Sequence, residues 1–313
     1  MIGATVSILN KMSDNLLLSD TAINTIVSDV SQHYRRFKTE SGRPIWQPSP
    51  QLKILQYWVV DFLRSNDNSA SEYATAYERG CSILQNAKRH EDSNHVLRMD
   101  VRHFFPSVGR SLILPYLNDL DLTSRLTNDD IELIFGIVLL NGGLTIGAPS
   151  SPIIANRAMI PFDLKVAEIA ESNNPKVTYT RYSDDLFFSS RSWIDGSFAK
   201  KIESMLHEYG LEANPQKTKF LGSGSNKMMA GVAINHEHKT SLGQKRKALL
   251  RQKLYSFMLQ DMPSEMDAHR LLGFITFAKF IEPNYVNKML VKYSSYGDDV
   301  MLKIAKALKT KQH

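Results

Sequence analysis

The stretch Val177–Ser190 reads VTYTRYSDDLFFSS and organises the centre of the chain. β-branched and aromatic residues, which favour strands, fill both of its ends. A short polar centre between two such runs predicts a β-hairpin with Ser183, Asp184 and Asp185 at its tip. Two adjacent carboxylates repel each other, so this tip loses stability unless a cation lies beside it. The hairpin is therefore a candidate metal site.

The same Tyr-x-Asp-Asp spelling recurs at Tyr296–Asp299, where the surroundings predict another structure. Apolar residues recur at helical spacing over residues 300–308. This pattern predicts a helix that Asp298 caps, with Asp299 near its positive end. We therefore expect the second copy to be a helix start and not a metal site.

Composition describes a folded, basic protein. The chain has 313 residues, an ordinary apolar fraction of 42% and a net charge of +6, which is compatible with a polyanionic partner. Cys81 is the single cysteine, so an intramolecular disulfide and a cysteine-rich zinc site are excluded. The sequence contains no apolar run long enough to span a bilayer and no signal-like start. We expect a cytoplasmic protein without membrane association.

The order of elements predicts an α+β fold. Strands and hairpins are expected in the middle of the chain, at 96–101, 177–190 and 228–242. Helices are expected at 1–40, where the segment ends in the basic residues 35–38, and at 51–64, 129–140, 198–209 and from 243 onward. A βαβ repeat with a glycine-rich turn is missing, which argues against a Rossmann fold.

Asp100 ends an apolar strand and is a second candidate for the metal site. An aspartate at a strand end can meet a hairpin turn on the neighbouring strand, so Asp100 and Asp184 would share one oxygen site. Mg²⁺ prefers a few carboxylates together with phosphate and water. Two such ions can activate a hydroxyl and stabilise the leaving oxygen of a phosphoryl transfer. Taken alone, however, Asp100 fits an ordinary strand-end or turn residue better than a metal ligand.

With these residues in place, the sequence resembles reverse transcriptases, most closely those of bacterial retrons. Four stretches occur in the order of the palm motifs of this family: Asp100 with Phe104–Ser107, Gly147–Pro152 continuing to Asn156, Tyr182–Asp185, and Asn214–Thr218. Asn86–His90 matches the Asn-Ala-x-x-His string of retron enzymes, and Arg43–Pro48 matches a fingers motif. The resemblance spans roughly residues 30 to 250.

Two departures from the family pattern concern substrate handling. Ile146 stands where the family usually has glutamine before its Gly-Ala-Pro string. Met229–Gly231 reads Met-Ala-Gly where retron enzymes usually have Val-Thr-Gly. The first affects a polar contact near the nucleotide, and the second affects an RNA contact.

The resemblance implies a right-hand polymerase with fingers, an α+β palm of antiparallel sheet plus helices, and a helical thumb. We expect N-terminal helices and fingers over 1–95, and a palm over 96–240 with a fingers-like insertion at 110–155. The basic helical thumb would cover 241–313.

The resemblance also implies roles for individual residues. The metal ligands would hold two Mg²⁺ ions, for which Mn²⁺ can substitute: Asp100, the Val101 carbonyl, Asp184 and Asp185. Lys217 would join the aspartates as a catalytic residue by neutralising or protonating the departing pyrophosphate. The nucleotide would be bound by Arg43 at its triphosphate, by Phe105 as a sugar gate, by Gly147, Ala148 and Pro149 below it, and by Tyr182 near the primer end.

The first helix of the thumb would bind RNA and DNA through Lys245, Arg246, Lys247 and Arg251. Ordinary alternatives are open for several of these residues. Arg43 is also compatible with a solvated loop, Phe105 with a core aromatic, and Lys217 and the thumb cations with a charged surface.

The predicted activity is RNA-directed DNA synthesis by a retron enzyme. By resemblance, it would copy a cognate structured noncoding RNA into a 2′–5′ branched, RNA-linked single-stranded DNA (msDNA) from deoxynucleoside triphosphates. It would act in antiphage defence with a separate effector protein. The alternatives are another bacterial reverse transcriptase, of the abortive-infection or group II intron type, and a degenerate RNA-binding scaffold. Intact Asp100, Asp184 and Asp185 argue against the scaffold.

Overall fold

The predicted central hairpin is present. The computed structural model describes residues 7–40, 42–67, 69–120 and 126–309. Strands β4 (Thr178–Tyr182) and β5 (Asp185–Ser190) pair antiparallel, with Tyr182 opposite Asp185. Ser183 has a φ of 60°, a left-handed conformation that lets two residues close the turn. The tip is therefore Ser183 and Asp184, and Asp185 is the first residue of β5 and not part of the turn.

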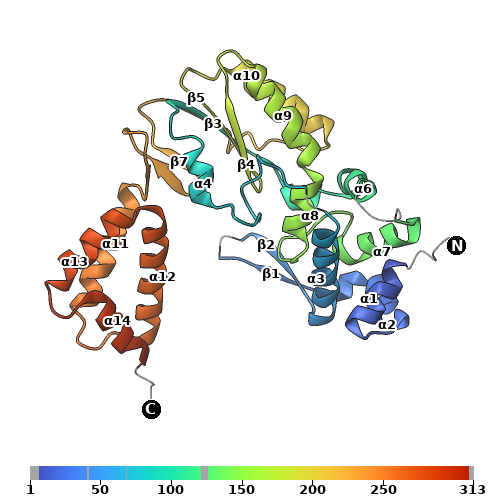
Figure 1. Cartoon of the computed structure of the whole chain (residues 1–313), viewed down its shortest axis with the longest axis horizontal. Helices are drawn as coiled ribbons and strands as arrows, with labels where there is room; N and C mark the ends of the chain where they lie inside the picture. Colours follow the sequence, from blue (N-terminus) through green and yellow to red (C-terminus); the bar gives the residue numbers. More distant parts are fainter. Residues whose placement is uncertain (1–6, 41, 68, 121–125, 310–313) are drawn as a thin grey trace. The chain divides into compact units, whose positions relative to one another are not determined.

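The hairpin belongs to a four-stranded sheet of order β4-β5-β3-β6. Strand β3 (His95–Asp100) lies beside β5, and β6 (Lys219–Leu221) lies at the far edge. Helix α9 (Ile160–Ser172) packs against β4, and α10 (Gly196–Glu208) packs against α9 (Figure 1). The sheet thus places the end of β3 next to the turn that follows β4.

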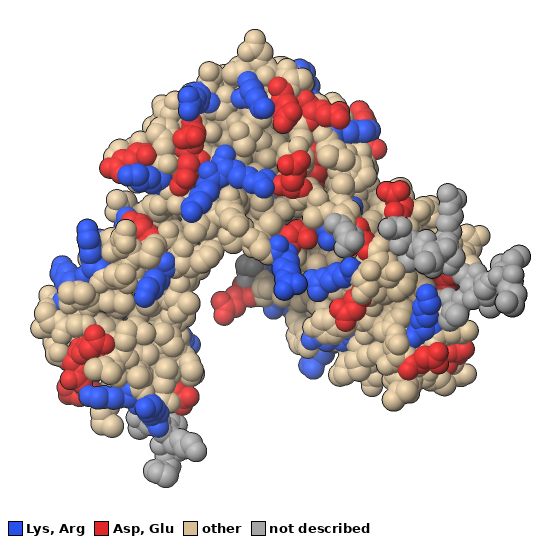
Figure 2. All heavy atoms as spheres, in the orientation of Figure 1, with Lys and Arg blue, Asp and Glu red and all other residues tan. Residues whose placement is uncertain are grey.

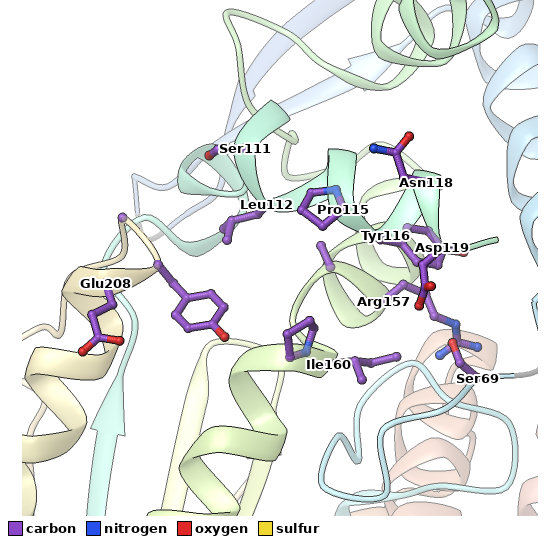
Figure 3. Close-up of a pocket in the computed structure, with 14 residues that line it drawn as sticks. Ser69, Ser111, Leu112, Pro115, Tyr116, Asn118, Asp119, Arg157, Ile160 and Glu208 are labelled. Carbon is purple, nitrogen blue, oxygen red and sulfur yellow. The ribbon is translucent and has the colours of Figure 1, made fainter. Parts of the chain in front are cut away.

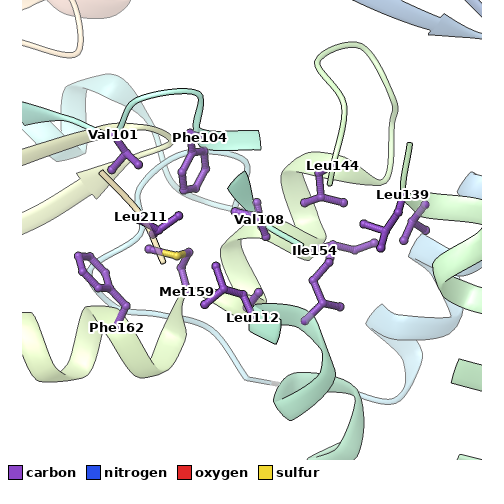
Figure 4. Packing of buried hydrophobic residues seen from close by; sticks show 14 of the residues in the cluster. Val101, Phe104, Val108, Leu112, Leu139, Leu144, Ile154, Met159, Phe162 and Leu211 are labelled. Atoms are coloured by element: carbon purple, nitrogen blue, oxygen red, sulfur yellow. The ribbon is translucent and has the colours of Figure 1, made fainter. Parts of the chain in front are cut away.

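One apolar core supports this sheet and the N-terminal elements. Its members include Val101 and Phe104 directly after β3, and Met159, Phe162 and Leu211 from the helical side (Figure 4). Each of these five side chains is at most 4% exposed. Because dense packing leaves little freedom for such side chains, the backbone that carries Asp100 is held firmly.

The N-terminal elements flank the same core. They are α1 (Ile8–Leu16), α2 (Asp20–Ser28), the short 3₁₀ helix η1 (Val30–His33), β1 (Tyr34–Lys38), β2 (Pro44–Pro48), α3 (Pro50–Ser65), α6 (Arg110–Asn118), α7 (Asn128–Val138) and α8 (Ser151–Ala158). The basic residues 35–38 were expected to end a helical segment, which is wrong, because they form β1 and pair with β2. Residues 1–6 of that expected segment lie outside the described residues.

The C-terminal part combines a small sheet with four helices. Strands β7 (Lys227–Met229), β8 (Val232–Ile234) and β9 (Thr240–Ser241) form a three-stranded antiparallel sheet, one strand more than the predicted hairpin. Helix α4 (Ile83–Lys88) packs on this sheet. The helices are α11 (Gln244–Met258), α12 (Glu265–Ile281), α13 (Pro283–Ser294) and α14 (Val300–Lys309).

The second Tyr-x-Asp-Asp string precedes a helix, as predicted, but the predicted cap is wrong by one residue. The Asp299 carboxylate accepts hydrogen bonds from the N–H groups of Met301 and Leu302, at 2.9 and 3.0 Å. Asp299 is therefore the capping residue. Asp298 pairs instead with Lys306, at 2.6 Å.

The chain divides into two units. Unit 1 comprises Met1–Cys81 and Val96–Phe220, and unit 2 comprises Ser82–His95 and Leu221–His313. The fingers, palm and thumb boundaries at 95/96 and 240/241 stay predictions. Among the described residues, no helix has the length and apolar character that a membrane crossing requires.

Candidate active site

Backbone hydrogen bonds bring Asp100 and Asp184 together, as expected from the sequence. The Val101 N–H, directly after Asp100, donates to the Asp184 carbonyl at 2.8 Å. On the other side of the strand, the Asn214 N–H donates to the Asp100 carbonyl at 2.7 Å. The end of β3 is therefore bonded both to the turn of the hairpin and to the segment that carries Lys217.

Lys217 lies against Asp100. Its Nζ is 2.7 Å from Asp100 Oδ2, with the carboxylate side chain 5% exposed and the lysine side chain 48% exposed. The Asn214 side-chain amide also donates to Asp100, at 3.4 Å. Two residues of the fourth predicted motif thus reach the carboxylate of the first.

Arg98 binds Asp185, a contact that the sequence reasoning missed. Its guanidinium donates to both carboxylate oxygens, with N–O distances of 2.8, 2.9 and 3.1 Å. Arg98 stands two residues before Asp100, and side chains two apart on a strand share a face. That spacing was the available signal for a cation on the side of the aspartates.

Burial raises the pKa of the Asp185 carboxyl above its ordinary value. The hydrogen bonds and charge of Arg98 oppose this shift, whereas the negative charges of Asp184 and Asp100 add to it. The three aspartates therefore interact electrostatically, and Arg98 offsets part of their mutual repulsion.

The chemistry of these donors suits a hard divalent cation. In the side-chain arrangement of the described residues, no three His, Cys, Asp or Glu groups lie close enough to hold a metal. Instead, the Lys217 ammonium and the Arg98 guanidinium lie against Asp100 and Asp185. Carboxylate oxygens are the ligand type that Mg²⁺ takes, so Asp100 and Asp184 fit such an ion once the Lys217 ammonium releases the Asp100 carboxylate.

Two aromatic residues of the predicted nucleotide site lie beside the turn. Phe105 is half-buried on the short helix α5 (Phe104–Ser107), next to the buried Phe104. Tyr182 is half-buried, and its phenol pKa is raised by burial and by the nearby Tyr77. The Tyr77 ring centre is 6.5 Å from that of Phe105.

The Gly147–Pro149 loop is joined to strand β2. The Trp46 N–H donates to the Ile146 carbonyl at 2.8 Å. Gly147 has a φ of 113°, and a Cβ there would lie 2.6 Å from the Trp46 carbonyl oxygen. A glycine is needed because the β2 backbone approaches so closely. Ile146 accepts the hydrogen bond from Trp46 through its backbone carbonyl. Having isoleucine in place of the usual glutamine therefore leaves this link between the loop and β2 unchanged.

The remaining nucleotide-site residues are placed as follows. Arg43 is exposed next to the start of β2, in the connection between β1 and β2. Gly147 is exposed, Ala148 is buried and Pro149 is half-buried, so the loop reaches the surface of unit 1 at Gly147.

The four predicted RNA-binding cations on α11 differ in their surroundings. Arg246 donates to the Gly231 carbonyl and lies 5.3 Å from the Phe277 ring centre. Lys247 pairs with Glu282 at 2.7 Å. These two cations hold α11 to the rest of unit 2.

Lys245 and Arg251 are exposed, and Arg251 donates to the hydroxyl of Tyr285. On the face drawn in Figure 2, the basic side chains over the helices of unit 2 form separate groups and not one continuous patch.

A cavity of about 710 Å³ in unit 1 is lined by none of the predicted site residues. Figure 3 shows residues of α6, among them Leu112, Pro115 and Tyr116, on one side of it, with Ile160 and Glu208 across from them. The aspartates and the aromatic residues beside them are therefore outside this cavity.

Comparison with known proteins identifies the family. The model of the reverse transcriptase (RNA-dependent DNA polymerase) family matches residues 34–276. The retron Ec83 reverse transcriptase of Escherichia coli is 30% identical over 275 residues, covering 83% of this chain and 87% of that protein. The chain belongs to the retron-type reverse transcriptases.

A second retron enzyme agrees with this assignment. The retron Ec86 reverse transcriptase of Escherichia coli is 27% identical over 299 residues, covering 91% of this chain and 90% of that protein. A solved telomerase from Candida albicans, in complex with a fragment of telomeric RNA, has a TM-score of 0.46 at 10% identity. It covers 92% of this chain and 65% of the telomerase, a likeness too low to support any inference.

As a retron-type reverse transcriptase, the protein is an RNA-directed DNA polymerase with a right-hand polymerase fold and nucleic-acid partners. The predicted family, fold class and enzyme class are thereby confirmed. Enzymes of this family generally use divalent metal ions.

Proposed function

We propose that this retron-type reverse transcriptase copies a cognate structured noncoding RNA into a 2′–5′ branched, RNA-linked DNA by two-metal phosphoryl transfer. One observation carries the catalytic part. The hydrogen bond between the Val101 N–H and the Asp184 carbonyl joins two predicted palm motifs, with Lys217 and Arg98 on the flanking carboxylates.

The metal site would be formed by Asp100, Asp184 and the Val101 carbonyl, with two Mg²⁺ ions or substituting Mn²⁺. When bound, these ions would supply Lewis-acid activation of the attacking hydroxyl and of the leaving phosphate oxygen. Asp185 supports the site more than it ligates, because both of its oxygens already accept hydrogen bonds from Arg98.

Lys217 would act on the leaving group. Its ammonium lies 2.7 Å from Asp100 on a side chain that is 48% exposed, so it can swing from the carboxylate to a phosphate. There it would neutralise the pyrophosphate or donate a proton to it.

The deoxynucleoside triphosphate would lie against the half-buried Phe105 ring, which would leave no room for a 2′-hydroxyl. Arg43 would reach its phosphates, since a guanidinium fits phosphate geometry. The loop of Gly147, Ala148 and Pro149 would lie below the nucleotide, and Tyr182 would pack at the primer end.

The template RNA and its DNA product would contact the thumb, residues 241–313, chiefly through the exposed Lys245 and Arg251. Arg246 and Lys247 serve this surface by fixing helix α11. Fingers over 1–95 and a palm over 96–240 complete the proposed division. We place the enzyme in the bacterial cytoplasm, acting with a separate effector protein in defence against phage.

The catalytic proposal is tested with two matched variants. Asp184→Asn and Asp298→Asn make the same change in the two copies of the Tyr-x-Asp-Asp string. Protein purified with its native RNA is given Mg²⁺ and labelled deoxynucleotides. We expect wild type and Asp298→Asn to make labelled DNA, and Asp184→Asn to make none while it retains the RNA. DNA synthesis by Asp184→Asn at the wild-type rate would contradict the assignment.

The product tests the retron part of the proposal. After ribonuclease digestion, a branched product keeps a ribonucleotide residue on the 5′ end of the DNA, which mass spectrometry detects. Unbranched DNA would contradict the proposed 2′–5′ branched product. If the wild type binds RNA but makes no DNA, this result would favour the alternative of a degenerate polymerase that acts as an RNA-binding scaffold.

A further inference from the structure

Tyr77 combines an exposed aromatic ring with an unusual backbone. Its side chain belongs to unit 1, is 48% exposed, and has a φ of 61°. A left-handed backbone is uncommon for residues other than glycine and is unfavourable for a bulky side chain. Burial cannot be the reason for placing a tyrosine here, because half of its surface is exposed.

Buried hydrogen bonds on both sides enforce this conformation. The Asn156 side-chain amide donates to the Ala76 carbonyl at 2.6 Å and to the Glu78 carboxylate at 3.0 Å. Arg157, whose side chain is 10% exposed, also binds Glu78 at 2.8 Å. The residues before and after Tyr77 are thus anchored to helix α8. Strain that the surroundings enforce in this way is concentrated at functional sites.

The preceding segment runs beside the catalytic hairpin. The Arg181 N–H donates to the Tyr73 carbonyl, and the Thr75 N–H donates to the Arg181 carbonyl, both at 2.8 Å. Arg181 is the second residue before the Ser183 turn, so the chain reaches Tyr77 alongside that turn. The backbone therefore brings Tyr77 to the turn that holds Ser183 and Asp184.

The Tyr77 side chain contacts the turn and faces its aromatic neighbours. Its hydroxyl donates to the Ser183 Oγ at 3.3 Å. Its ring centre lies 6.5 Å from that of Phe105. Tyr182, on the other side of the turn, is close enough for Tyr77 to affect its pKa. The Tyr77 side chain thus contacts the Ser183 turn and lies next to the Phe105 ring, and Tyr77 itself belongs to none of the predicted motifs.

We propose that Tyr77 is a substrate-contacting residue whose ring packs on the base pair at the primer terminus, while its hydroxyl positions the Ser183 turn. This inference rests on the proposed catalytic role of that turn. A base has an aromatic face whatever its identity, so such packing raises affinity without selecting a sequence. The loss of one base–aromatic contact corresponds to roughly a 10-fold to 100-fold loss of affinity.

The test separates the ring from the hydroxyl. Tyr77→Ala removes both, and Tyr77→Phe removes only the hydroxyl. Tyr57→Ala is the matched control, because Tyr57 is a 49% exposed tyrosine of the same unit, on helix α3. The probe is a labelled DNA primer annealed to a longer RNA strand, and its binding is measured by fluorescence anisotropy without nucleotides.

We expect Tyr77→Ala to weaken duplex binding at least 10-fold, and Tyr77→Phe and Tyr57→Ala to bind like the wild type. In primer extension, Tyr77→Ala should raise the KM for the duplex, whereas Tyr77→Phe should lower kcat a few-fold with an unchanged KM.

Wild-type duplex affinity in Tyr77→Ala would overturn the proposal. So would a loss of melting temperature and of kcat in Tyr77→Ala with an unchanged KM, because that pattern indicates a structural role only. The binding assay needs no catalysis, so it decides on Tyr77 even if extension by the wild type fails and the proposed function fails with it.

Discussion

Arg98 holds both carboxylate oxygens of Asp185 in a forked arrangement, with N–O distances of 2.8 to 3.1 Å. The two side chains are 35% and 16% exposed, so water screens this pair less than a surface ion pair. The planar guanidinium fixes the direction of the carboxylate as well as its charge. Arg98 thus fixes the orientation of the Asp185 carboxylate beside Asp100 and Asp184.

Arg98→Ala should lower the single-turnover rate of primer extension at saturating Mg²⁺ at least tenfold, because Asp185 is no longer held. The Mg²⁺ concentration for half-maximal rate should fall, since a positive charge has been removed. Arg98→Lys should give an intermediate rate, because a lysine keeps the charge and loses the fork. Arg102→Ala is the control, as its pair with Glu212 is exposed and 3.8 Å long. An unchanged rate in Arg98→Ala would refute this role.

Phe105→Val should let the enzyme incorporate ribonucleotides. A smaller side chain next to the sugar leaves room for a 2′-hydroxyl, so the ratio of kcat/KM for deoxynucleotide over ribonucleotide should fall at least tenfold. Competition of the two nucleotides in primer extension measures this ratio. Phe220→Val, a change at an exposed phenylalanine stacked on Trp193, should leave it unchanged. If Phe105→Val keeps the wild-type ratio, Phe105 is not the sugar gate.

Lys245→Ala combined with Arg251→Ala should weaken RNA binding and reduce its salt dependence. Each lost phosphate contact removes about 0.7 to 0.9 from the slope of log K against log salt. Lys306→Ala is the control, because Lys306 pairs with Asp298. Arg246→Ala and Lys247→Ala should instead lower the melting temperature, because they release helix α11. If the double variant and the wild type have the same salt slope, Lys245 and Arg251 do not contact RNA phosphates.

His90 should make the protein less stable in acid. Burial lowers its pKa from 6.5 to about 3, with a smaller contribution from the charge of Arg89. The unfolded chain therefore binds a proton below pH 6.5 that the folded chain binds only near pH 3. Stability falls as the pH drops from 6.5 toward 3. Urea unfolding at pH 7 and pH 4.5 should show a smaller loss for His90→Phe than for the wild type. Equal losses would contradict the prediction.

Asp299→Ala should destabilise unit 2 by roughly 1 kcal/mol, the usual effect of losing an N-cap. Asp298→Ala should leave the melting temperature nearly unchanged, because its pair with Lys306 is exposed. Differential scanning calorimetry of the two variants checks this order. If Asp298→Ala lowers the melting temperature more than Asp299→Ala does, Asp298 is the capping residue.

Local patterns in the sequence predicted the parts of the site whose structure depends on near neighbours. The hairpin around Ser183 follows from strand-forming residues on both sides of a polar turn, and the helix after Asp299 follows from its apolar spacing. Both are present. The ordered motifs also placed Asp100 and Lys217 in one site, because each motif has a defined place in the family. The exact capping residue was missed, since Asp298 and Asp299 are equally good caps by type.

Contacts between distant segments were decided only by the tertiary structure. The spacing of Arg98 from Asp100 puts both side chains on one face of β3, but only the strand order β4-β5-β3-β6 determines that Arg98 meets Asp185. Asn156 and Arg157, on helix α8, hold the loop residue Tyr77 in a left-handed conformation. The sequence predicted four RNA-binding cations on helix α11, but packing decided that Arg246 and Lys247 face their own unit. The sequence alone determined which chemical groups the protein has, and packing between remote elements decided which of them meet.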